Sequence, residues 1–216
     1  MNQLSRTAAR PELRLRRCRT VFLDRDGTVN VKASHPGYIT SPDGLFLIPG
    51  AAAAISALNQ AAMRVILVTN QRWLSDPARD LTDYAQVHAR LEELLAAEGA
   101  HLDAAYYCPH DRGCCDCRKP GTGMLRRAAR EHRFSLGAAV MIGDSETDVS
   151  AGRAAGTATI LLRSGQRTAL RDADFVADDL AEAVHLVLSD RELGPASALT
   201  TNVRRVGSTG RGGVGC

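Results

Sequence analysis

Short apolar segments alternate with helical segments along residues 20–188. The apolar segments have the length of buried strands and occupy residues 20–24, 64–70, 103–108, 138–144 and 157–162, with a shorter one at 174–176. Segments with the composition or spacing of helices lie between them, at residues 51–62, 82–98, 125–134, 147–156 and 179–188. Strands that alternate with helices are typical of βαβ units. The pattern therefore predicts an α/β fold with a doubly wound parallel sheet, in which ligands bind beyond the carboxyl ends of the strands.

The charge of the 216-residue chain is unevenly distributed. Six arginines and one glutamate give residues 1–19 a net charge of +5, and four arginines and one glutamate give residues 191–216 a net charge of +3. Because the whole chain carries +3, the body between these ends carries −5, which disfavours a nucleic-acid-binding face. We expect a folded domain at residues 20–190, between a basic, disordered N-terminal segment (1–19) and a flexible Gly-rich tail (191–216).

Composition excludes several classes of protein. Hydrophobic residues make up 44% of the chain and charged residues 24%, which is ordinary for a globular domain. No apolar run approaches the roughly 18 residues of a membrane span, and residues 1–19 lack the apolar core of a secretory signal. Six cysteines are too few for a scaffold stapled by disulfides. We expect a cytoplasmic monomer that binds neither nucleic acid nor a membrane.

Polar side chains follow three of the predicted strands. They are Asp24 and Asp26 after the first strand, Thr69-Asn70-Gln71 at the end of the second, and Asp144 and Asp148 after the fourth. The carboxyl ends of parallel strands meet at one edge of a sheet, so these carboxylates lie close together and repel each other unless a cation joins them. A hard, oxygen-binding ion such as Mg²⁺ fits best, and because Mg²⁺ usually binds substrate phosphates as well as carboxylates, we expect a phosphorylated ligand.

The sequence Asp24-Arg25-Asp26 suits a two-step transfer reaction. The two carboxylates are neighbours in different surroundings, so one can stay ionised as a nucleophile while the other carries a proton. Gly27 permits the tight turn that follows. Acids at the end of a strand are common without such a role, but here an apolar strand precedes the pair and Asp144 follows another strand, which favours the catalytic interpretation.

Four segments, in order along the chain, resemble the motifs of the haloacid dehalogenase-type phosphohydrolases: FLDRDGTVN, VTNQ, CRKP and MIGDSETD. The resemblance spans residues 20 to about 162 and implies a Rossmann-like fold with an aspartyl-phosphate mechanism. It makes Asp24 the nucleophile and Asp26 the general acid and base. It also assigns Mg²⁺ to Asp24, Asp144 and the backbone carbonyl of Asp26, and it assigns the phosphoryl oxygens to Thr69 and Lys119.

Residues 108–117 form a dense cluster of sulfur and imidazole ligands, Cys-Pro-His-Asp-Arg-Gly-Cys-Cys-Asp-Cys. Thiolates and an imidazole in one short loop are typical of a tetrahedral zinc site, but spacing alone leaves the choice between Cys114 and Cys115 open. Cys-x-His, a loop and Cys-x-Cys-Arg-Lys-Pro resemble the D-glycero-D-manno-heptose 1,7-bisphosphate 7-phosphatases and the related histidinol phosphatases. That resemblance leaves Cys114 as a spare thiol and places a structural zinc in the loop 108–118, which serves as a minimal cap. The implied ligands are Cys108, His110, Cys115 and Cys117.

The motifs define the substrate contacts less closely than they define the catalytic and metal-binding residues. Relatives have a segment ending in Gly-Tyr that contacts substrate, which points to Gly37 and Tyr38, with Asn30 and His35 as further candidates. The remaining predicted contacts are Asn70, Gln71, Arg72 and Arg118. An arginine next to the catalytic lysine suits a bidentate contact with a second phosphate or a hydroxyl.

The chain departs from the family at two places near the predicted site. Arg72 and Trp73 replace a small Ser-Gly pair, and Ser145 replaces a lysine that often follows the last-motif aspartate. Arg72 could replace the lost cation. Trp73 could either cap the pocket or pack against a neighbouring helix.

These features together predict a Mg²⁺-dependent phosphatase that hydrolyses the 7-phosphate of a heptose 1,7-bisphosphate. An open pocket under a minimal cap suits a small phosphorylated metabolite as the partner. One alternative is a phosphatase of histidinol phosphate or of another small sugar phosphate. The other is a non-catalytic binding module stapled by zinc, against which the intact Asp24, Asp26, Lys119 and Asp144 argue.

Overall fold

The strands expected from the apolar runs form one parallel sheet. The computed structural model describes residues 14–34, 37–163 and 172–192. Every neighbouring pair of strands is parallel, and the strand order is β3-β2-β1-β4-β5-β6. The strands are β1 (Thr20–Leu23), β2 (Arg64–Asn70), β3 (Ala104–Cys108), β4 (Ala139–Gly143), β5 (Ala158–Leu162) and β6 (Phe175–Ala177). All six predicted strands and the α/β fold class are confirmed.

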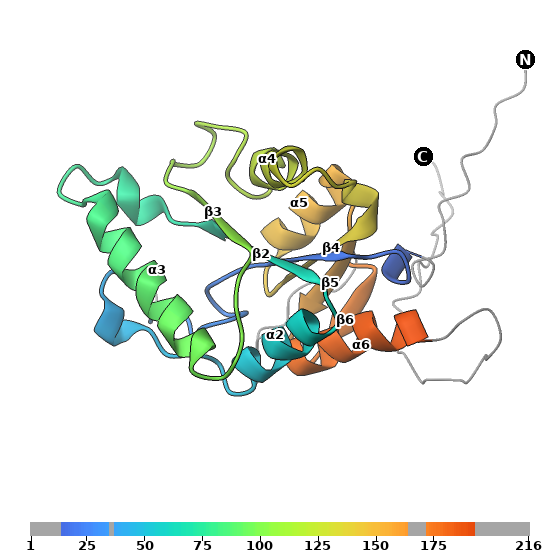
Figure 1. The fold of residues 1–216 in the computed structure, drawn as a ribbon. Helices are drawn as coiled ribbons and strands as arrows, with labels where there is room; N and C mark the ends of the chain where they lie inside the picture. Colours follow the sequence, from blue (N-terminus) through green and yellow to red (C-terminus); the bar gives the residue numbers. More distant parts are fainter. Residues whose placement is uncertain (1–13, 35–36, 164–171, 193–216) are drawn as a thin grey trace, which may run out of the picture.

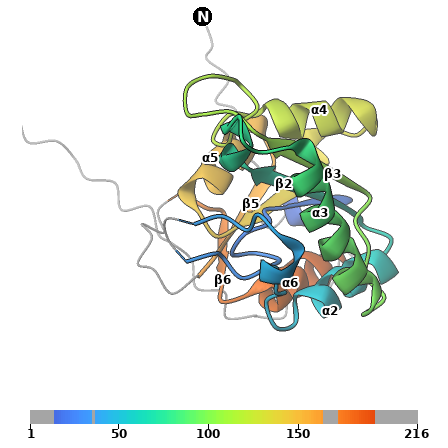
Figure 2. The ribbon, with the colours of Figure 1, turned by 90° about the vertical axis from the view of Figure 1, so that its left-hand side faces the viewer.

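Helices cover both faces of the sheet. Figures 1 and 2 show α4 and α5 on one side and α2 and α6 on the other. The helices are α2 (Ala51–Gln60), α3 (Leu81–Ala96), α4 (Gly123–Glu131), α5 (Glu146–Ala155) and α6 (Leu180–Glu192). These are the five helices that the sequence predicts, with ends displaced by a few residues. Among the described residues, three short 3₁₀ helices that the sequence does not predict lie in the connections: η1 (Pro42–Gly44), η2 (Arg72–Ser75) and η3 (Leu136–Ala138).

Strands β1 to β4 contribute side chains to two cores, one on either face of the sheet, whereas the core residues of β5 and β6 belong to one of these cores. On β1, Val21 and Leu23 pack with residues of α2, α3 and α6, whereas Phe22 packs with residues of α4 and α5. Successive side chains of a strand point to opposite faces, so a strand covered on both faces must be apolar throughout. This requirement explains why the strands read as continuous apolar runs and not as an alternating pattern.

The strand order reverses at β1. The chain adds β2 and β3 on one side of β1, and then crosses to add β4, β5 and β6 on the other side. Connections at such a switch point leave the sheet in opposite directions, which opens a crevice beyond the carboxyl ends of the strands. The fold therefore places the residues that follow β1 and β4 beside one another.

The folded domain begins before residue 20. The sequence analysis assigns residues 14–19 to the basic N-terminal segment, but Leu15 and Cys18 are buried in the main core, and the Arg19 N–H donates to the carbonyl of Ala138. Residues 1–13 and 193–216 lie outside the described residues, so the expectations for the rest of both ends stay predictions. Within the described ranges, no helix combines the length and apolar character needed to cross a bilayer.

Candidate active site

Three carboxylates converge at the switch point of the sheet. Asp24 follows β1, Asp144 follows β4 and Asp148 lies in the first turn of α5, and each offers an oxygen within 4.8 Å of the others. Asp148 is held there because the backbone N–H and the hydroxyl of Ser145 donate to its Oδ2 atom, at 3.1 and 2.5 Å. The structure thus brings the strand-end acids together, as the parallel sheet predicts.

Lys119 joins two of these carboxylates. Its side chain is buried, and its Nζ atom lies 2.6 Å from Asp24 Oδ1, 2.6 Å from Asp148 Oδ1 and 2.8 Å from the carbonyl oxygen of Val68. These contacts use all three donors of the ammonium group. Asn70, at the end of β2, donates to the carbonyl of Lys119 and accepts from its N–H, both at 3.0 Å. Asn70 of β2 therefore fixes the backbone of Lys119 close to Asp24, which follows β1.

A second lysine reaches the carboxylates from the segment after β1. Lys32 Nζ lies 2.5 Å from Asp144 Oδ2, and about half of the Lys32 side chain is exposed. Gly27 leaves the space for this contact: with a φ of +91°, a side chain there would be strained and would collide with the Asp144 carboxylate and the Lys32 stem. The sequence analysis missed Lys32 because its segment has no periodicity and carries no motif.

Burial and crowding set the charge of this cluster. Burial raises the pKa of Asp24 to about 7, an effect that Lys119 opposes and that the charges of Asp148 and Asp26 strengthen. Burial also raises the pKa of Asp144, although its lysine partner opposes the shift. Burial alone would lower the pKa of Lys119, but its two carboxylate partners raise it. The cluster therefore combines a fixed positive charge with carboxylates that are costly to ionise without a further cation.

The carboxylates fit a divalent cation. Asp144 is buried, and its Oδ1 atom has no hydrogen-bond partner among the described residues. A buried carboxylate oxygen is costly unless a donor or a cation pairs with it, and a group of carboxylate oxygens is what Mg²⁺ prefers. The residues present thus suit the expected Mg²⁺, with Asp24 and Asp144 as its side-chain ligands.

Asp26 lies beside the cluster and is held by a separate set of donors. Its Oδ2 atom accepts from Gln71 Nε2 at 2.8 Å, and its Oδ1 atom accepts from Asn30 Nδ2 at 3.0 Å and from Arg25 Nη2 at 3.1 Å. About a quarter of the Asp26 side chain is exposed. The two acids of the Asp-x-Asp motif therefore have different surroundings, as expected, with Asp24 buried against a lysine and Asp26 open to the cavity.

A cavity of about 490 Å³ opens over these side chains. Thr69 and Asn70 line it from the end of β2, and Gly37 and Tyr38 line it from the segment after β1. Its volume lies within the range of small-molecule sites, which is roughly 300–1,000 Å³. The polar cluster forms one side of the cavity, and the Gly-Tyr segment offers a partly apolar surface for the rest of a ligand.

The expected zinc ligands form a second cluster. The Sγ atoms of Cys108, Cys115 and Cys117 lie 3.1, 3.3 and 3.5 Å apart, and His110 Nδ1 lies 3.3 Å from Cys117 Sγ and 3.6 Å from Cys108 Sγ. Tetrahedral zinc with bonds of about 2.0–2.3 Å holds such ligands roughly 3.5–3.8 Å apart. The four side chains therefore need only small adjustments to bind one zinc ion.

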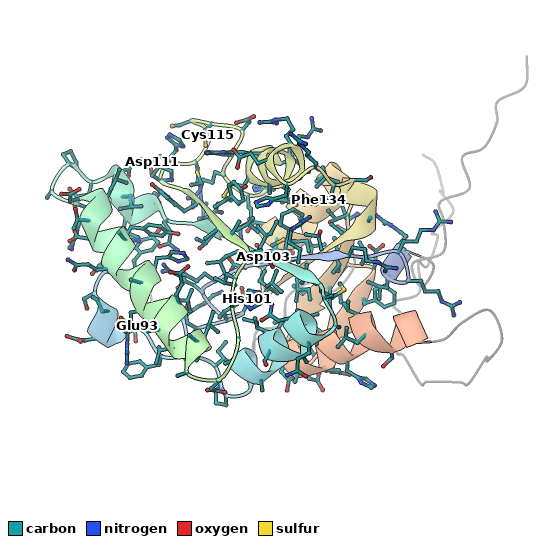
Figure 3. The ribbon with its side chains drawn as sticks, viewed as in Figure 1. Glu93, His101, Asp103, Asp111, Cys115 and Phe134 are labelled. Carbon is teal, nitrogen blue, oxygen red and sulfur yellow. The ribbon has the colours of Figure 1, made fainter. Side chains whose placement is uncertain are left out.

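Cys114, the alternative ligand left open by the spacing, lies outside this cluster. It is exposed, and its thiol donates to the carbonyl of Arg112 at 3.7 Å. Figure 3 labels Cys115 and Asp111 in the loop that leads from the end of β3 toward α4. Two residues after Cys117 the chain reaches Lys119, so one short segment joins the zinc cluster to the lysine of the carboxylate cluster.

Comparisons with known proteins agree with this geometry. Residues 116–183 match the family described as HAD-hydrolase-like. The D-glycero-D-manno-heptose-1,7-bisphosphate 7-phosphatase of Thermosynechococcus vestitus is 41% identical over 190 residues, which cover 77% of this chain and 94% of that protein. The chain belongs to this family of HAD-like phosphatases.

Other members of the family support the assignment. The D-glycero-beta-D-manno-heptose-1,7-bisphosphate 7-phosphatase of Pseudomonas aeruginosa is 37% identical, over 78% of this chain and 97% of that protein. The crystal structure of D,D-heptose 1,7-bisphosphate phosphatase from B. bronchiseptica, complexed with magnesium and phosphate, superposes with a TM-score of 0.73 at 33% identity. That match covers 80% of this chain and 99% of the other. The family predicted from the four motifs is confirmed.

Three of the expected substrate contacts of this HAD-like phosphatase lie away from the cavity. Gln71 is fully buried, and both atoms of its amide are used within the protein. Arg72 pairs with Asp111 at 3.5 Å, and Arg118 donates to the carbonyl of His110 at 3.2 Å. The prediction for Gln71 is corrected, because its side chain is buried and its amide is used within the protein, whereas Arg72 and Arg118 stay predicted contacts. The expectation that Arg72 replaces the missing cation also stays a prediction, and Lys32 is a second cation, which the structure places against the Asp144 carboxylate.

Two open questions about neighbouring residues are also settled by burial. Trp73 is 7% exposed and its indole N–H donates to Gln71 Oε1, so it packs beneath the site and does not cap it. Asn30 is fully buried and donates to Asp26, which makes it a support of the acid and not a substrate contact. His35 lies outside the described residues. Asp148, which the sequence analysis places among the converging acids, belongs to the cluster and contacts Lys119.

Proposed function

We propose that the protein is a Mg²⁺-dependent phosphatase that hydrolyses the 7-phosphate of D-glycero-D-manno-heptose 1,7-bisphosphate. The observation that carries the proposal is the convergence of Asp24, Asp26, Lys119 and Asp144 at one open cavity. The substrate follows from relatives at 41% and 37% identity, which are named heptose-bisphosphate 7-phosphatases. The structural relative that contains magnesium and phosphate supports the metal.

The first chemical step transfers the phosphoryl group to Asp24. A carboxylate oxygen of Asp24 attacks phosphorus, the bond from phosphorus to the sugar oxygen breaks, and Asp26 donates a proton to that oxygen. Lys119 and the hydroxyl of Thr69 bind phosphoryl oxygens and offset their charge. Mg²⁺, when held by Asp24, Asp144 and the backbone carbonyl of Asp26, supplies further neutralisation of that charge.

The second step restores Asp24. Asp26, now ionised, removes a proton from a water molecule that attacks phosphorus, and the bond between phosphorus and the Asp24 oxygen breaks to release phosphate. Asp26 suits both proton transfers because it is partly exposed at the cavity and is held by neutral amides as well as by an arginine. Lys119 orients Asp24 before the substrate binds, and it exchanges one of its three present acceptors for a phosphoryl oxygen when the substrate arrives.

The zinc in this proposal is structural. Four protein ligands fill a tetrahedral site and leave no position open for chemistry, so the ion fixes the segment that leads to Lys119. The partner is a small phosphorylated metabolite. We also infer a cytoplasmic monomer without nucleic-acid or membrane partners, for which the net charge of −5 on residues 20–190 is the support on the nucleic-acid side.

Phosphate release by the zinc-loaded protein tests this proposal. The substrates are heptose 1,7-bisphosphate, histidinol phosphate and a panel of sugar monophosphates, each with and without Mg²⁺. We expect the highest kcat/KM on the heptose bisphosphate, with a requirement for Mg²⁺ and for Asp24. A higher kcat/KM on histidinol phosphate would replace the substrate and keep the chemistry. Unchanged release by Asp24→Asn would overturn the mechanism, and no release from any substrate would favour a zinc-stapled binding module.

A further inference from the structure

Gln71 lies beneath the catalytic cavity, between two residues that act on the substrate in the proposed function. We propose that Gln71 is a positioning residue that fixes the side chains of Asp26 and Thr69 relative to each other. Trp73 and Arg25 set the orientation of its amide. The inference rests on the proposed phosphatase activity, but the contacts on which it depends can be tested without that activity.

The amide nitrogen of Gln71 has two donors, and each meets a different catalytic side chain. It donates to Asp26 Oδ2 at 2.8 Å and to Thr69 Oγ1 at 2.7 Å. Because the Thr69 hydroxyl accepts from Gln71, its own hydrogen is free to donate to a phosphoryl oxygen. One amide group therefore fixes the general acid and base relative to a group that binds the phosphate.

The amide oxygen of Gln71 is fixed from the other side. The indole N–H of Trp73 donates to Gln71 Oε1 at 2.6 Å, and Arg25 Nη2 donates to the same atom at 3.2 Å. Both groups can only donate, so the flipped amide would point its NH₂ group at two donors and its oxygen at the Asp26 carboxylate. The orientation that serves Asp26 and Thr69 is thus the one that Trp73 and Arg25 enforce.

Burial makes this arrangement costly to disturb and prevents Gln71 from touching the substrate. Gln71 and Arg25 are fully buried, Trp73 is 7% exposed, and none of the three lines the cavity. A buried polar group that loses its partner pays the full cost of desolvation. Because Gln71 acts through residues that work in the chemical steps, its loss should lower kcat and leave KM nearly unchanged.

Two substitutions in the zinc- and Mg²⁺-loaded full chain remove these contacts with little change in shape. Gln71→Met removes both amide donors, and Trp73→Phe removes the indole donor but keeps a packed ring. We expect kcat for phosphate release to fall about 30-fold in Gln71→Met and about 5-fold in Trp73→Phe, with KM within about twofold. Gln60→Met, the same change on the exposed surface of α2, is the matched control and should keep the kcat of the wild-type protein.

Two further readouts separate positioning from a general loss of structure. The double variant Gln71→Met/Trp73→Phe should have the kcat of Gln71→Met, because Trp73 acts only through Gln71. Trp73 is the only tryptophan of the chain, so its fluorescence emission reports on its hydrogen bond without any label. We expect the emission to move to shorter wavelength in Gln71→Met, while the far-UV circular dichroism stays unchanged.

Each outcome supports or overturns the inference. Wild-type kcat in Gln71→Met overturns it, and so does a double variant whose loss equals the product of the two single losses. A raised KM with unchanged kcat makes Gln71 a substrate contact and overturns the positioning role. If the wild-type protein releases no phosphate, the proposed function fails instead, and an unchanged Trp73 emission in Gln71→Met then overturns the contact itself.

Discussion

Two clusters of metal-binding side chains flank Lys119, and the chain builds them in different ways. The carboxylate cluster draws Asp24, Asp144 and Asp148 from distant parts of the sequence, and the order of the parallel strands brings them together. The zinc cluster draws all four of its ligands from residues 108–117. The first is therefore a property of the whole fold, whereas the second is a property of one short segment, the end of β3 and the loop that follows it.

The clusters also differ in what holds them without a metal. Lys119 and Lys32 pair with the carboxylates, so the protein itself supplies two positive charges beside the three acids. The thiols of the zinc cluster mainly contact one another and His110, and their loop has no regular secondary structure. We infer that the carboxylate cluster persists when its metal is removed, whereas the zinc loop needs its ion to stay folded.

The largest expected effect comes from Asp24, the proposed nucleophile. Asp24→Asn replaces the attacking carboxylate with an amide that cannot form an aspartyl phosphate, so kcat should fall at least about 10⁴-fold. The zinc content should stay at the wild-type level because the two clusters share no residue. Phosphate release and metal analysis of the same preparation measure both quantities. A variant that lost its zinc would show that the two clusters fold as one unit.

A variant of a proposed zinc ligand tests the other cluster, in which we expect the loop to depend on its metal ion. Cys117→Ser removes one of four ligands, so the protein should lose its zinc on dialysis and release the segment that leads to Lys119. We expect kcat to fall about 10- to 100-fold, with Mg²⁺ still required for the remaining turnover. Zinc stoichiometry by mass spectrometry and phosphate release measure the outcome.

Cys114→Ser is the matched control, because this thiol is exposed and lies outside the cluster. It should keep both zinc and activity. Loss of zinc from Cys114→Ser together with full zinc in Cys115→Ser would reverse the ligand assignment.

The sequence predicts the strands and their terminal acids well because both follow from local order along the chain. Each apolar run ends where the sheet ends, and Thr69 and Asp144 stand at those ends. The parallel arrangement then requires the ends to meet. The zinc ligands are predictable for a related reason, since the end of one strand and the loop after it contain them all, and spacing leaves open only the choice between Cys114 and Cys115.

The sequence fails where burial or the path of a loop decides. Gln71 follows Thr69 in a motif, which favours a substrate contact, but the chain turns its side chain beneath the cavity. Lys32 lies in a segment without periodicity, so nothing local connects it to Asp144. Residues 14–19 read as a charged tail because composition counts their arginines, whereas Leu15 packs into the core.

Lys32 marks a further difference between the two clusters. Its ammonium group pairs with Asp144 and therefore competes with a metal ion for that carboxylate, whereas we describe no such competing cation for the zinc ligands. Lys32→Met keeps the length of the side chain and removes its charge, so phosphoryl oxygens lose a nearby cation. We expect kcat/KM to fall about 10-fold. The same variant should bind Mg²⁺ more tightly, because Asp144 Oδ2 no longer pairs with an ammonium group. A titration of phosphate release with Mg²⁺ measures both changes, and weaker Mg²⁺ binding would contradict the competition.

The smallest effect is expected at the surface ion pair between Arg72, which follows β2, and Asp111 in the loop of the zinc cluster. Arg72 lies 3.5 Å from Asp111, and about half of each side chain is exposed, so solvent screens the pair and its contribution is below about 1 kcal/mol. Arg72→Gln should therefore keep kcat/KM within about twofold of the wild-type value. The measurement is kcat/KM for phosphate release by Arg72→Gln, compared with that of Lys32→Met under the same conditions. If Arg72→Gln lost as much activity as Lys32→Met, Arg72 would leave Asp111 to bind the substrate during turnover, and the cation lost at Ser145 would have two replacements.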